Sequence, residues 1–172
     1  MAHLTVDVEY GVHSLLCLAA FPGAPLSGRD LADLQGISAT SVVKIFPKLE
    51  EAGIVRTVEG TGGGYVLAKP PEEISILAIV DAVEGKKRLF ECEDIRGRCA
   101  VFGKNPPGWA TGGLCSIHAA ILRAEKAMRE SLASQTLGDI VQAVGRKAPP
   151  EFSFPNEIRK WLDGRTVALS LR

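Results

Sequence analysis

Three cysteines that lie close together in sequence are the residues best suited to chemistry in this chain of 172 residues. Cys92, Cys99 and Cys115 fall within 24 residues of one another, in a stretch rich in turn-forming residues, and Cys17 stands apart from them. Thiolates bind iron–sulfur clusters or zinc, and a complete site of either kind takes four ligands. Structural disulfides are not expected in a reducing compartment. The three thiols therefore indicate metal binding or redox chemistry.

A fourth ligand has to come from outside this set, and three polar side chains can supply it. His118 follows Cys115 by three positions. Glu9 and His13 are four residues apart, which places them on one face of a helix, with Cys17 one further turn along. Each has a plainer alternative, since Glu9 and His13 can form a surface pair and Cys17 can be a small buried apolar side chain. The residues alone leave these alternatives open.

The first 74 residues carry the pattern of a winged helix-turn-helix. After a helix predicted over residues 5–20, Ser27 and Ser38 are good N-cap residues for two shorter helices joined by a glycine-containing turn. Residues 54–67 then contain two strand-forming stretches around a turn with four glycines, which predicts a β-hairpin. A hairpin directly after a helix-turn-helix is a wing, and this combination is typical of DNA-binding domains.

In such a domain the helix that begins at Ser38 enters the major groove, and its first residues reach the base edges. The polar and wing residues expected to contact bases or phosphates are Ser38, Thr40, Ser41, Lys44, Lys48, Glu59, Thr61 and Gly62. The alternative is a solvated helix face in a winged helix that binds protein. Residues 28–69 hold five basic and five acidic side chains, so a single copy would bind DNA weakly. We therefore expect two half-sites on a dimer.

A long helix is predicted over residues 116–134, after an irregular loop over residues 86–114. One face of this helix carries an apolar stripe formed by Ile117, Ile121, Ala124, Met128 and Leu132. A narrow apolar seam on a helix of this length favours pairing with a second copy, and packing on its own domain is the alternative.

The expected fold class is mainly α with a small β-hairpin wing. Residues 1–74 form the winged helix-turn-helix, and residues 75–145 form the cysteine loop and the dimerisation helix. Residues 146–172 are expected to form a C-terminal tail with a short helix near Trp161.

Composition excludes several classes of protein. Lysine plus arginine and aspartate plus glutamate each number 20, so binding of nucleic acid by bulk charge is excluded. The longest wholly apolar run, residues 15–21, is far shorter than the ~20 residues that cross a bilayer. No lysine or arginine precedes Arg29, which argues against a secretory signal. We expect a cytoplasmic protein without a membrane partner.

The segment from Ile54 to Ile74, with its Gly-Gly-Tyr and Pro-Pro-Glu-Glu-Ile strings, resembles the wing signature of the bacterial Rrf2 family, the IscR/NsrR-type transcriptional regulators. Leu4-Thr5, residues 32–53 and Thr136-Leu137 are similar to that family too, so the resemblance covers roughly residues 3–145. It implies a homodimer of winged-helix domains joined through the long helix. Such a dimer controls promoters in response to a cluster or a metabolite.

The resemblance also implies roles for the ligand candidates. IscR-type proteins place their last cysteine and a histidine ligand where Cys115 and His118 stand. The gap from Cys99 to Cys115 is much longer than the IscR-type spacing, which weakens a scheme of three cysteines and His118. Glu59 stands where many members have an arginine in the wing, so the promoter sequence cannot be transferred from other members.

A mixed ligand set is implied by a second similarity within the family. Glu9 falls where NsrR-type proteins use a carboxylate from the partner subunit. The sequence around Glu9 and His13 is most similar to RsrR-type redox sensors, which bind a 2Fe–2S cluster with two cysteines from one subunit and a Glu and a His from the other. Carried over, Cys99 and Cys115 would pair with Glu9 and His13 of a second copy, and Cys92 would stay outside the ligand set.

We therefore expect a homodimer that binds double-stranded promoter DNA and senses redox state, nitric oxide or iron–sulfur status through a 2Fe–2S cluster held by the loop 92–115. A cluster-free thiol switch and a zinc-stabilised adaptor for protein partners are the alternatives. A thiol enzyme with Cys115 as nucleophile and His118 as base lacks a recognisable oxyanion hole or substrate pocket. We expect no enzymatic activity and no small-molecule substrate.

Overall fold

The computed structural model describes residues 4–170, with side chains described as far as Gly164. The chain divides into two compact units. Residues 4–86 and 132–170 form one unit, which we call the winged-helix unit. Residues 87–131 form the other, which we call the cysteine unit.

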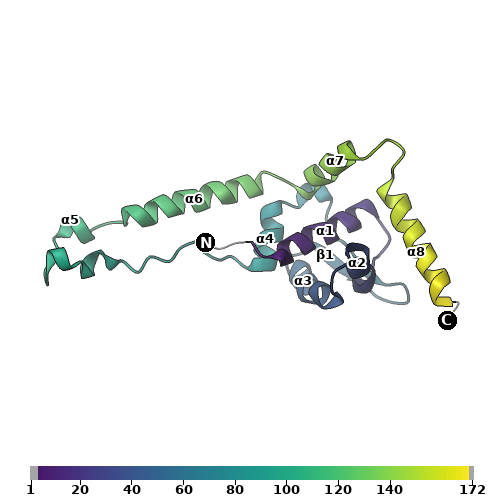
Figure 1. Cartoon of the computed structure of the whole chain (residues 1–172), viewed down its shortest axis with the longest axis horizontal. Helices are drawn as coiled ribbons and strands as arrows, with labels where there is room; N and C mark the ends of the chain where they lie inside the picture. Colours follow the sequence, from purple (N-terminus) through teal and green to yellow (C-terminus); the bar gives the residue numbers. More distant parts are fainter. Residues whose placement is uncertain (1–3, 171–172) are drawn as a thin grey trace. The chain divides into compact units, whose positions relative to one another are not determined.

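The winged-helix unit contains the elements that the sequence predicts for a winged helix-turn-helix (Figure 1). In chain order they are α1 (Val6–Ala20), α2 (Gly28–Gln35), α3 (Ala39–Glu51), β1 (Val55–Val58), β2 (Gly64–Leu67), the 3-10 turn η1 (Pro71–Glu73), α4 (Ile76–Glu84), α7 (Leu137–Lys147) and α8 (Phe154–Ser170). The predicted fold class, mainly helical with one antiparallel pair of strands, is confirmed.

Side-chain caps place the two helices of the helix-turn-helix. Ser27 Oγ accepts the Asp30 N–H at 3.1 Å, and the Asp30 carboxylate accepts the Ser27 N–H, so that α2 begins with a capping box. Gly36 ends α2 in the left-handed conformation, with φ of 64°. Ser38 Oγ accepts the Thr40 N–H at 3.1 Å and starts α3. The turn between the helices therefore follows from local sequence.

The wing is attached to the helices by hydrogen bonds at both of its strands. On β1, the N–H and the hydroxyl of Thr57 donate to Glu50 of α3 at 2.8 and 2.7 Å. On β2, Tyr65 exchanges two backbone hydrogen bonds with Leu26, of 3.1 and 2.9 Å, so the segment before α2 adds a short third edge to the hairpin. A Cβ at Gly64 would lie 2.4 Å from the Leu26 carbonyl oxygen, so this approach requires glycine.

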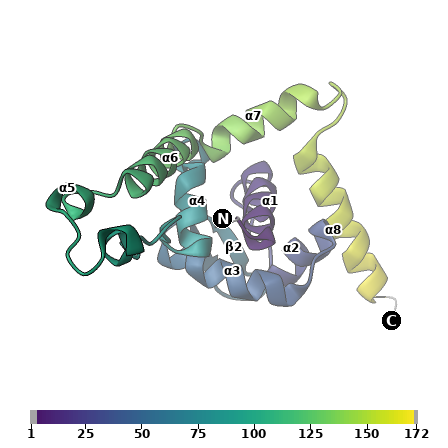
Figure 2. The same ribbon diagram turned by 60° about the vertical axis from the view of Figure 1, so that its left-hand side comes forward.

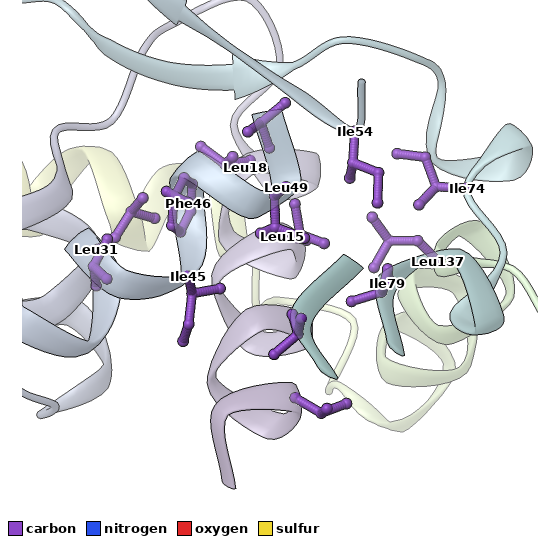
Figure 3. Close-up of a cluster of buried hydrophobic side chains, with 14 of the residues drawn as sticks. Leu15, Leu18, Leu31, Ile45, Phe46, Leu49, Ile54, Ile74, Ile79 and Leu137 are labelled. Carbon is purple, nitrogen blue, oxygen red and sulfur yellow. The ribbon is translucent and has the colours of Figure 1, made fainter. Parts of the chain in front are cut away.

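The hydrophobic core of the winged-helix unit lies between α1, α3, α4, the hairpin and the start of α7 (Figure 3). Its labelled members are Leu15, Leu18, Leu31, Ile45, Phe46, Leu49, Ile54, Ile74, Ile79 and Leu137. A Cβ at Gly11 would lie 3.5 Å from Val83 and 3.6 Å from Ile45, so α3 and α4 pack on α1 at ordinary van der Waals distances. Because burying a large apolar side chain contributes about 1.5–3 kcal/mol, this core fixes α3 relative to α1.

The segments before α4 and before α7 pair with each other. Ser75 and Thr136 form an antiparallel bridge, in which the Leu137 N–H donates to Ile74 at 2.8 Å and the Ile76 N–H donates to Gln135 at 2.9 Å. This pairing places α4 and α7 in the winged-helix unit. The division therefore differs from the expected boundaries at residues 74 and 145, which grouped both helices with the cysteine loop.

The C-terminal tail forms a helix of 17 residues, which includes Trp161 and is longer than the short helix predicted there. Ile158 is 5% exposed and belongs to the core, and Leu162 packs against that core. The Arg159 guanidinium lies 5.6 Å from the centre of the Phe21 ring. These contacts come from distant parts of the chain, and they stabilise a helix that the local pattern alone does not indicate.

The cysteine unit consists of a loop that folds back along a helix (Figure 2). Its elements are the 3-10 turns η2 (Ile95–Arg98) and η3 (Ala100–Phe102), the short α5 (Gly108–Thr111), and α6 (Ser116–Ala133), which continues two residues into the other unit. The Leu89 N–H donates to Glu125 at 3.4 Å, and the rings of Phe90 and His118 meet edge to face at 5.7 Å. None of the residues of α6 is buried.

None of the helices in the described residues is long and apolar enough to span a membrane.

Candidate functional site

Cys115 is placed at the start of α6, where the free backbone N–H groups of the helix are available to its side chain. Its carbonyl accepts the Ala119 N–H at 2.8 Å, which makes it the N-cap residue. The backbone N–H groups of His118 and Ile117 donate to its sulfur, and they lower the pKa of this thiol below its usual value. Cys115 is therefore prepared to act as a thiolate.

Arg96 joins the two ends of the cysteine loop. Its guanidinium donates to the carbonyls of Gly112 and Gly113 at 3.4 and 3.1 Å, just before Cys115 in the chain. It also interacts electrostatically with Cys115 and Cys92. Its positive charge favours the thiolate form of Cys115 and lowers that pKa further, after the larger effect of the backbone N–H groups. Sequence reasoning missed Arg96, although it lies between Cys92 and Cys99.

The fold of this loop brings the three loop cysteines to one region. Hydrogen bonding to the Cys92 side chain is the smallest of the effects that lower the pKa of Cys115. Cys99 is exposed, and it lines the same pocket as Cys115, together with Phe102 and Trp109, whose rings meet edge to face at 5.7 Å. Cys92 thus contributes to the lowered pKa of Cys115, whereas Cys99, which the resemblance pairs with Cys115, shares its pocket.

The donor set of the cysteine unit fits part of a cluster site. Among residues 4–170, no three side chains of His, Cys, Asp or Glu are grouped closely enough to hold a metal ion. Cys99 and Cys115 line one pocket, and the lowered pKa of Cys115 favours its thiolate, so two thiols match two of the four ligands that a 2Fe–2S cluster takes. The remaining ligands would have to come from other residues of this chain or from a second copy.

The other ligand candidates are accessible to different degrees. Glu9 and His13 are exposed on one face of α1. His118 is half-buried, with its ring against Phe90. Cys17 is half-buried against the core, and burial raises the pKa of its thiol, which disfavours the thiolate that a metal would need. Glu9 and His13 are thus free of the core, whereas Cys17 packs against it.

The candidate DNA-contacting residues that lie at the start of α3 and in the turn of the wing are accessible. Those classed as exposed are Ser38, Thr40, Glu59, Thr61 and Gly62, and Ser41 is half-buried. Ser38 uses its hydroxyl oxygen to cap α3, and its hydroxyl hydrogen remains able to donate.

The two lysines expected to reach phosphates both have partners within the protein. Lys44 Nζ lies 2.7 Å from an Asp7 carboxylate oxygen on α1. Its hydrogen bond to Asp7 and the attraction of that charge raise the pKa of Lys44. Lys48 Nζ donates to the Val83 carbonyl at the end of α4, at 2.7 Å. In this structure both ammonium groups are therefore engaged within the protein and not available to DNA.

Two basic residues near the wing were missing from the sequence prediction. Arg56 on β1 and Lys69 after β2 are exposed, and both line a pocket beside the hairpin together with Phe21 and Pro25. The sequence could have indicated them, because both stand in or beside the strands of the predicted wing and few other cations lie near it. Exposed cations beside a wing are suited to phosphate contacts.

Comparison with known proteins identifies the family. The family described as "Rrf2: Iron-dependent Transcriptional regulator" matches residues 4–143. The chain is 28% identical over 173 residues to the HTH-type transcriptional regulator IscR of Erwinia tasmaniensis, a match that covers 98% of each protein. It is 38% identical over 90 residues to the HTH-type transcriptional regulator NsrR of Shouchella clausii, which covers 52% of this chain and 60% of that relative's length.

A solved structure agrees with this assignment. CymR, the global cysteine regulator of B. subtilis, superposes with a TM-score of 0.61 and 26% sequence identity, over 83% of this chain and 98% of CymR. The predicted resemblance is confirmed by the family match and by the shared winged-helix fold. The expectation that the protein is not an enzyme agrees with its relatives, which are transcriptional regulators. This chain belongs to the Rrf2 family of DNA-binding transcriptional regulators.

Proposed function

We propose that this transcriptional regulator is a homodimer that senses redox state, nitric oxide or iron–sulfur status through a 2Fe–2S cluster bound by its cysteine unit. The observation that carries the proposal is the position of Cys115 at the N-terminus of α6, where it shares a pocket with Cys99 and Arg96. The backbone N–H groups there and the charge of Arg96 lower the pKa of Cys115. This arrangement favours a thiolate, and the thiolate is the form that binds iron.

The ligand set that we propose combines two copies of the chain. Cys115 and one of the other two loop cysteines come from one copy, and Glu9 and His13 of α1 come from the second. Cys92 is favoured by its effect on the pKa of Cys115, and Cys99 by the pattern of related proteins. His118 is the alternative to residues of a second copy. When bound, the cluster supplies a site that gains or loses one electron.

The second copy is expected along α6. This helix has no buried residue, and its predicted apolar stripe remains accessible, with Ile117 66% and Met128 38% exposed. At the end of the stripe Leu132 packs on the winged-helix core. A helix with an apolar face that its own chain leaves open is suited to pairing with its counterpart.

In such a dimer, ligand binding would be linked to DNA through α1. Glu9 and His13 lie on the exposed face of α1, and the opposite face packs against α3. Holding α1 of one copy to the cysteine unit of the other would therefore fix the position of α3. The two recognition helices must match half-sites ~34 Å apart, so a change in α1 alters operator affinity.

The first test is a visible absorption spectrum of protein purified without oxygen, together with iron and sulfide quantification. Near-stoichiometric iron and sulfide with a brown colour are expected. Single substitutions Cys92→Ser and Cys99→Ser separate the two cysteine candidates, because loss of colour is expected only for a ligand. Cys17→Ser is the matched control and should leave the spectrum unchanged. A colourless protein that also fails anaerobic reconstitution would refute the cluster.

A cluster-free thiol switch is the second candidate, and the effect of Cys92 on the pKa of Cys115 also favours it. A peroxide would transfer one oxygen to the Cys115 thiolate as its O–O bond breaks, giving a sulfenic acid and releasing water or an alcohol. The Cys92 sulfur would then displace that oxygen as a second water and form a disulfide. The two cysteine sulfurs together lose two electrons, which the peroxide gains.

This second candidate is tested on metal-free protein with one equivalent of hydrogen peroxide. Loss of two thiols and a cross-linked peptide containing Cys92 and Cys115 are expected, together with altered DNA affinity that dithiothreitol reverses. Cys92→Ser should stop at the sulfenic acid. If peroxide leaves the thiols and the DNA affinity unchanged, the pair is not a switch.

A further inference from the structure

We propose that Asp7 limits the DNA affinity of this regulator by holding Lys44 of α3 away from the phosphate backbone. The inference rests on the DNA-binding function and concerns a residue of α1 that acts through a residue of the recognition helix. Asp7 is thus a positioning residue, and the ion pair between them is the contact that DNA has to displace.

The placement of Lys44 on α3 makes it a natural phosphate contact. It follows Thr40 by four residues, so both side chains lie on the same face of the helix that begins with the expected base contacts. The Lys44 side chain is 62% exposed, whereas Asp7 is only 19% exposed. The lysine can therefore leave the pair toward a ligand in solution, and the aspartate stays in place.

The first turn of α1 is anchored, so Asp7 is not a loosely placed partner. The N–H of Thr5 donates to Glu84 of α4 at 2.9 Å, and its hydroxyl donates to the same carboxylate oxygen. The Glu84 charge also acts on Lys44. Lys44 thus faces two carboxylates that both belong to the core-packed helices of this unit.

Lys48, one turn further along α3, is held by a different kind of partner. Its ammonium donates to the Val83 backbone carbonyl, which is neutral and lies in the last turn of α4. That bond secures α3 to α4 and carries no charge that competes with phosphate. Lys44, unlike Lys48, is therefore held by a negatively charged group, and this carboxylate competes with DNA phosphate for the same ammonium group.

Competition between Asp7 and phosphate has a measurable signature. While Lys44 stays with Asp7, it releases no counterion from DNA, and the carboxylate repels the backbone. A freed lysine adds one phosphate contact, which steepens the slope of log K against log salt by about 0.9. Asp7 lies two residues from Glu9, the proposed cluster ligand on the same helix. A displacement of α1 that separates Asp7 from Lys44 would therefore raise DNA affinity.

The test compares Asp7→Asn with the unaltered protein on a duplex of mixed sequence, since phosphate contacts do not depend on sequence. Tighter binding by roughly three- to tenfold at low salt and a salt slope steeper by about 0.9 are expected. Glu51→Gln is the matched control. It removes an exposed negative charge from α3, the helix that carries Lys44, and the slope should not change.

A double-mutant cycle separates exchange of Lys44 from a general effect of charge. Lys44→Gln alone should change the affinity and the slope little, because the paired lysine contributes little. In a Lys44→Gln background, Asp7→Asn should no longer steepen the slope. If Asp7→Asn tightens binding equally in both backgrounds, or in neither, the inference is overturned. If the unaltered protein and every variant fail to bind DNA, the DNA-binding function itself is overturned. Thermal unfolding of each variant confirms that it is folded.

Discussion

At the scale of single residues, Cys115 shows how an ordinary helix start can become a reactive position. A cysteine in the N-cap place accepts the backbone N–H groups that a serine or aspartate would otherwise satisfy. Stabilising the thiolate in this way needs no dedicated base. The adjacent Arg96 adds a positive charge and fixes the preceding glycine turn.

The lowered pKa of Cys115 leads to a prediction about pH. The thiolate should persist below the pH at which an ordinary thiol is protonated, so iodoacetamide should alkylate Cys115 at a lower pH than the thiol of a short cysteine-containing peptide. Cys17, whose pKa is raised by burial, should react last. Mass spectrometry of metal-free protein and of the peptide across a pH series measures all three. Equal profiles for Cys115 and the peptide thiol would show that the helix start has no such effect.

Single residues also show where sequence reasoning ended. The spacing along α3 correctly placed Lys44 and Lys48 on a helix that begins at Ser38. Their partners, Asp7 and Val83, are 37 and 35 residues away in sequence. Such contacts depend on how α1 and α4 pack on α3, and no local pattern contains that information. The residue type and the helical position of each lysine were predictable, whereas the group that each ammonium binds was not.

At the scale of elements, α1 carries a glycine that the structure does not require. A Cβ at Gly11 would meet Val83 and Ile45 at 3.5 and 3.6 Å, which are ordinary van der Waals distances. Gly11→Ala should therefore stabilise the protein by about 0.5–1 kcal/mol, because glycine loses more conformational freedom on folding. Thermal or denaturant unfolding measures this. A lower free energy of unfolding would show that the helices around α1 are packed more tightly than these distances indicate.

The wing depends on glycine for a different reason. At Gly64 a Cβ would lie 2.4 Å from a backbone oxygen of Leu26, which cannot move independently of the chain. Gly64→Ala should cost about 2 kcal/mol or more of unfolding free energy and weaken DNA binding by displacing the hairpin. Gly28→Ala, where the nearest contact is 3.5 Å, is the control and should be close to neutral. Similar stability of the two variants would contradict the role of this close approach.

The elements themselves were largely predictable, because caps, glycines and apolar spacing are local signals. The α2 and α3 boundaries follow from Ser27, Gly36 and Ser38. The pairing of Leu26 with Tyr65 and the length of α8 were not predictable, since both depend on contacts between distant segments. The sequence likewise placed three cysteines in one loop, but it did not show which of them lies near Cys115, because that depends on how the loop folds.

At the scale of the whole molecule, the proposed dimer through α6 can be tested directly. Ile121→Glu places a charge in the middle of the apolar stripe, and we expect the dimer to dissociate because a buried unpaired charge is costly. Light scattering after gel filtration should then give the monomer mass, and operator affinity should fall by at least tenfold because two half-sites are no longer joined. Ala133→Glu, at an exposed position of α6 outside the apolar stripe, is the control and should remain dimeric. A dimer that survives Ile121→Glu would place the interface elsewhere.

The pairing of Ser75 with Thr136 has a mechanical consequence for the whole molecule. It makes the cysteine unit an insertion in the winged-helix unit, attached at residues 86–87 and again at residues 131–132. The second attachment lies within α6, which continues unbroken across it. A domain on one flexible tether can reorient without loading its neighbour. The cysteine unit has two attachments, and the second leads along α6 directly into the Ser75–Thr136 bridge on which α4 and α7 begin.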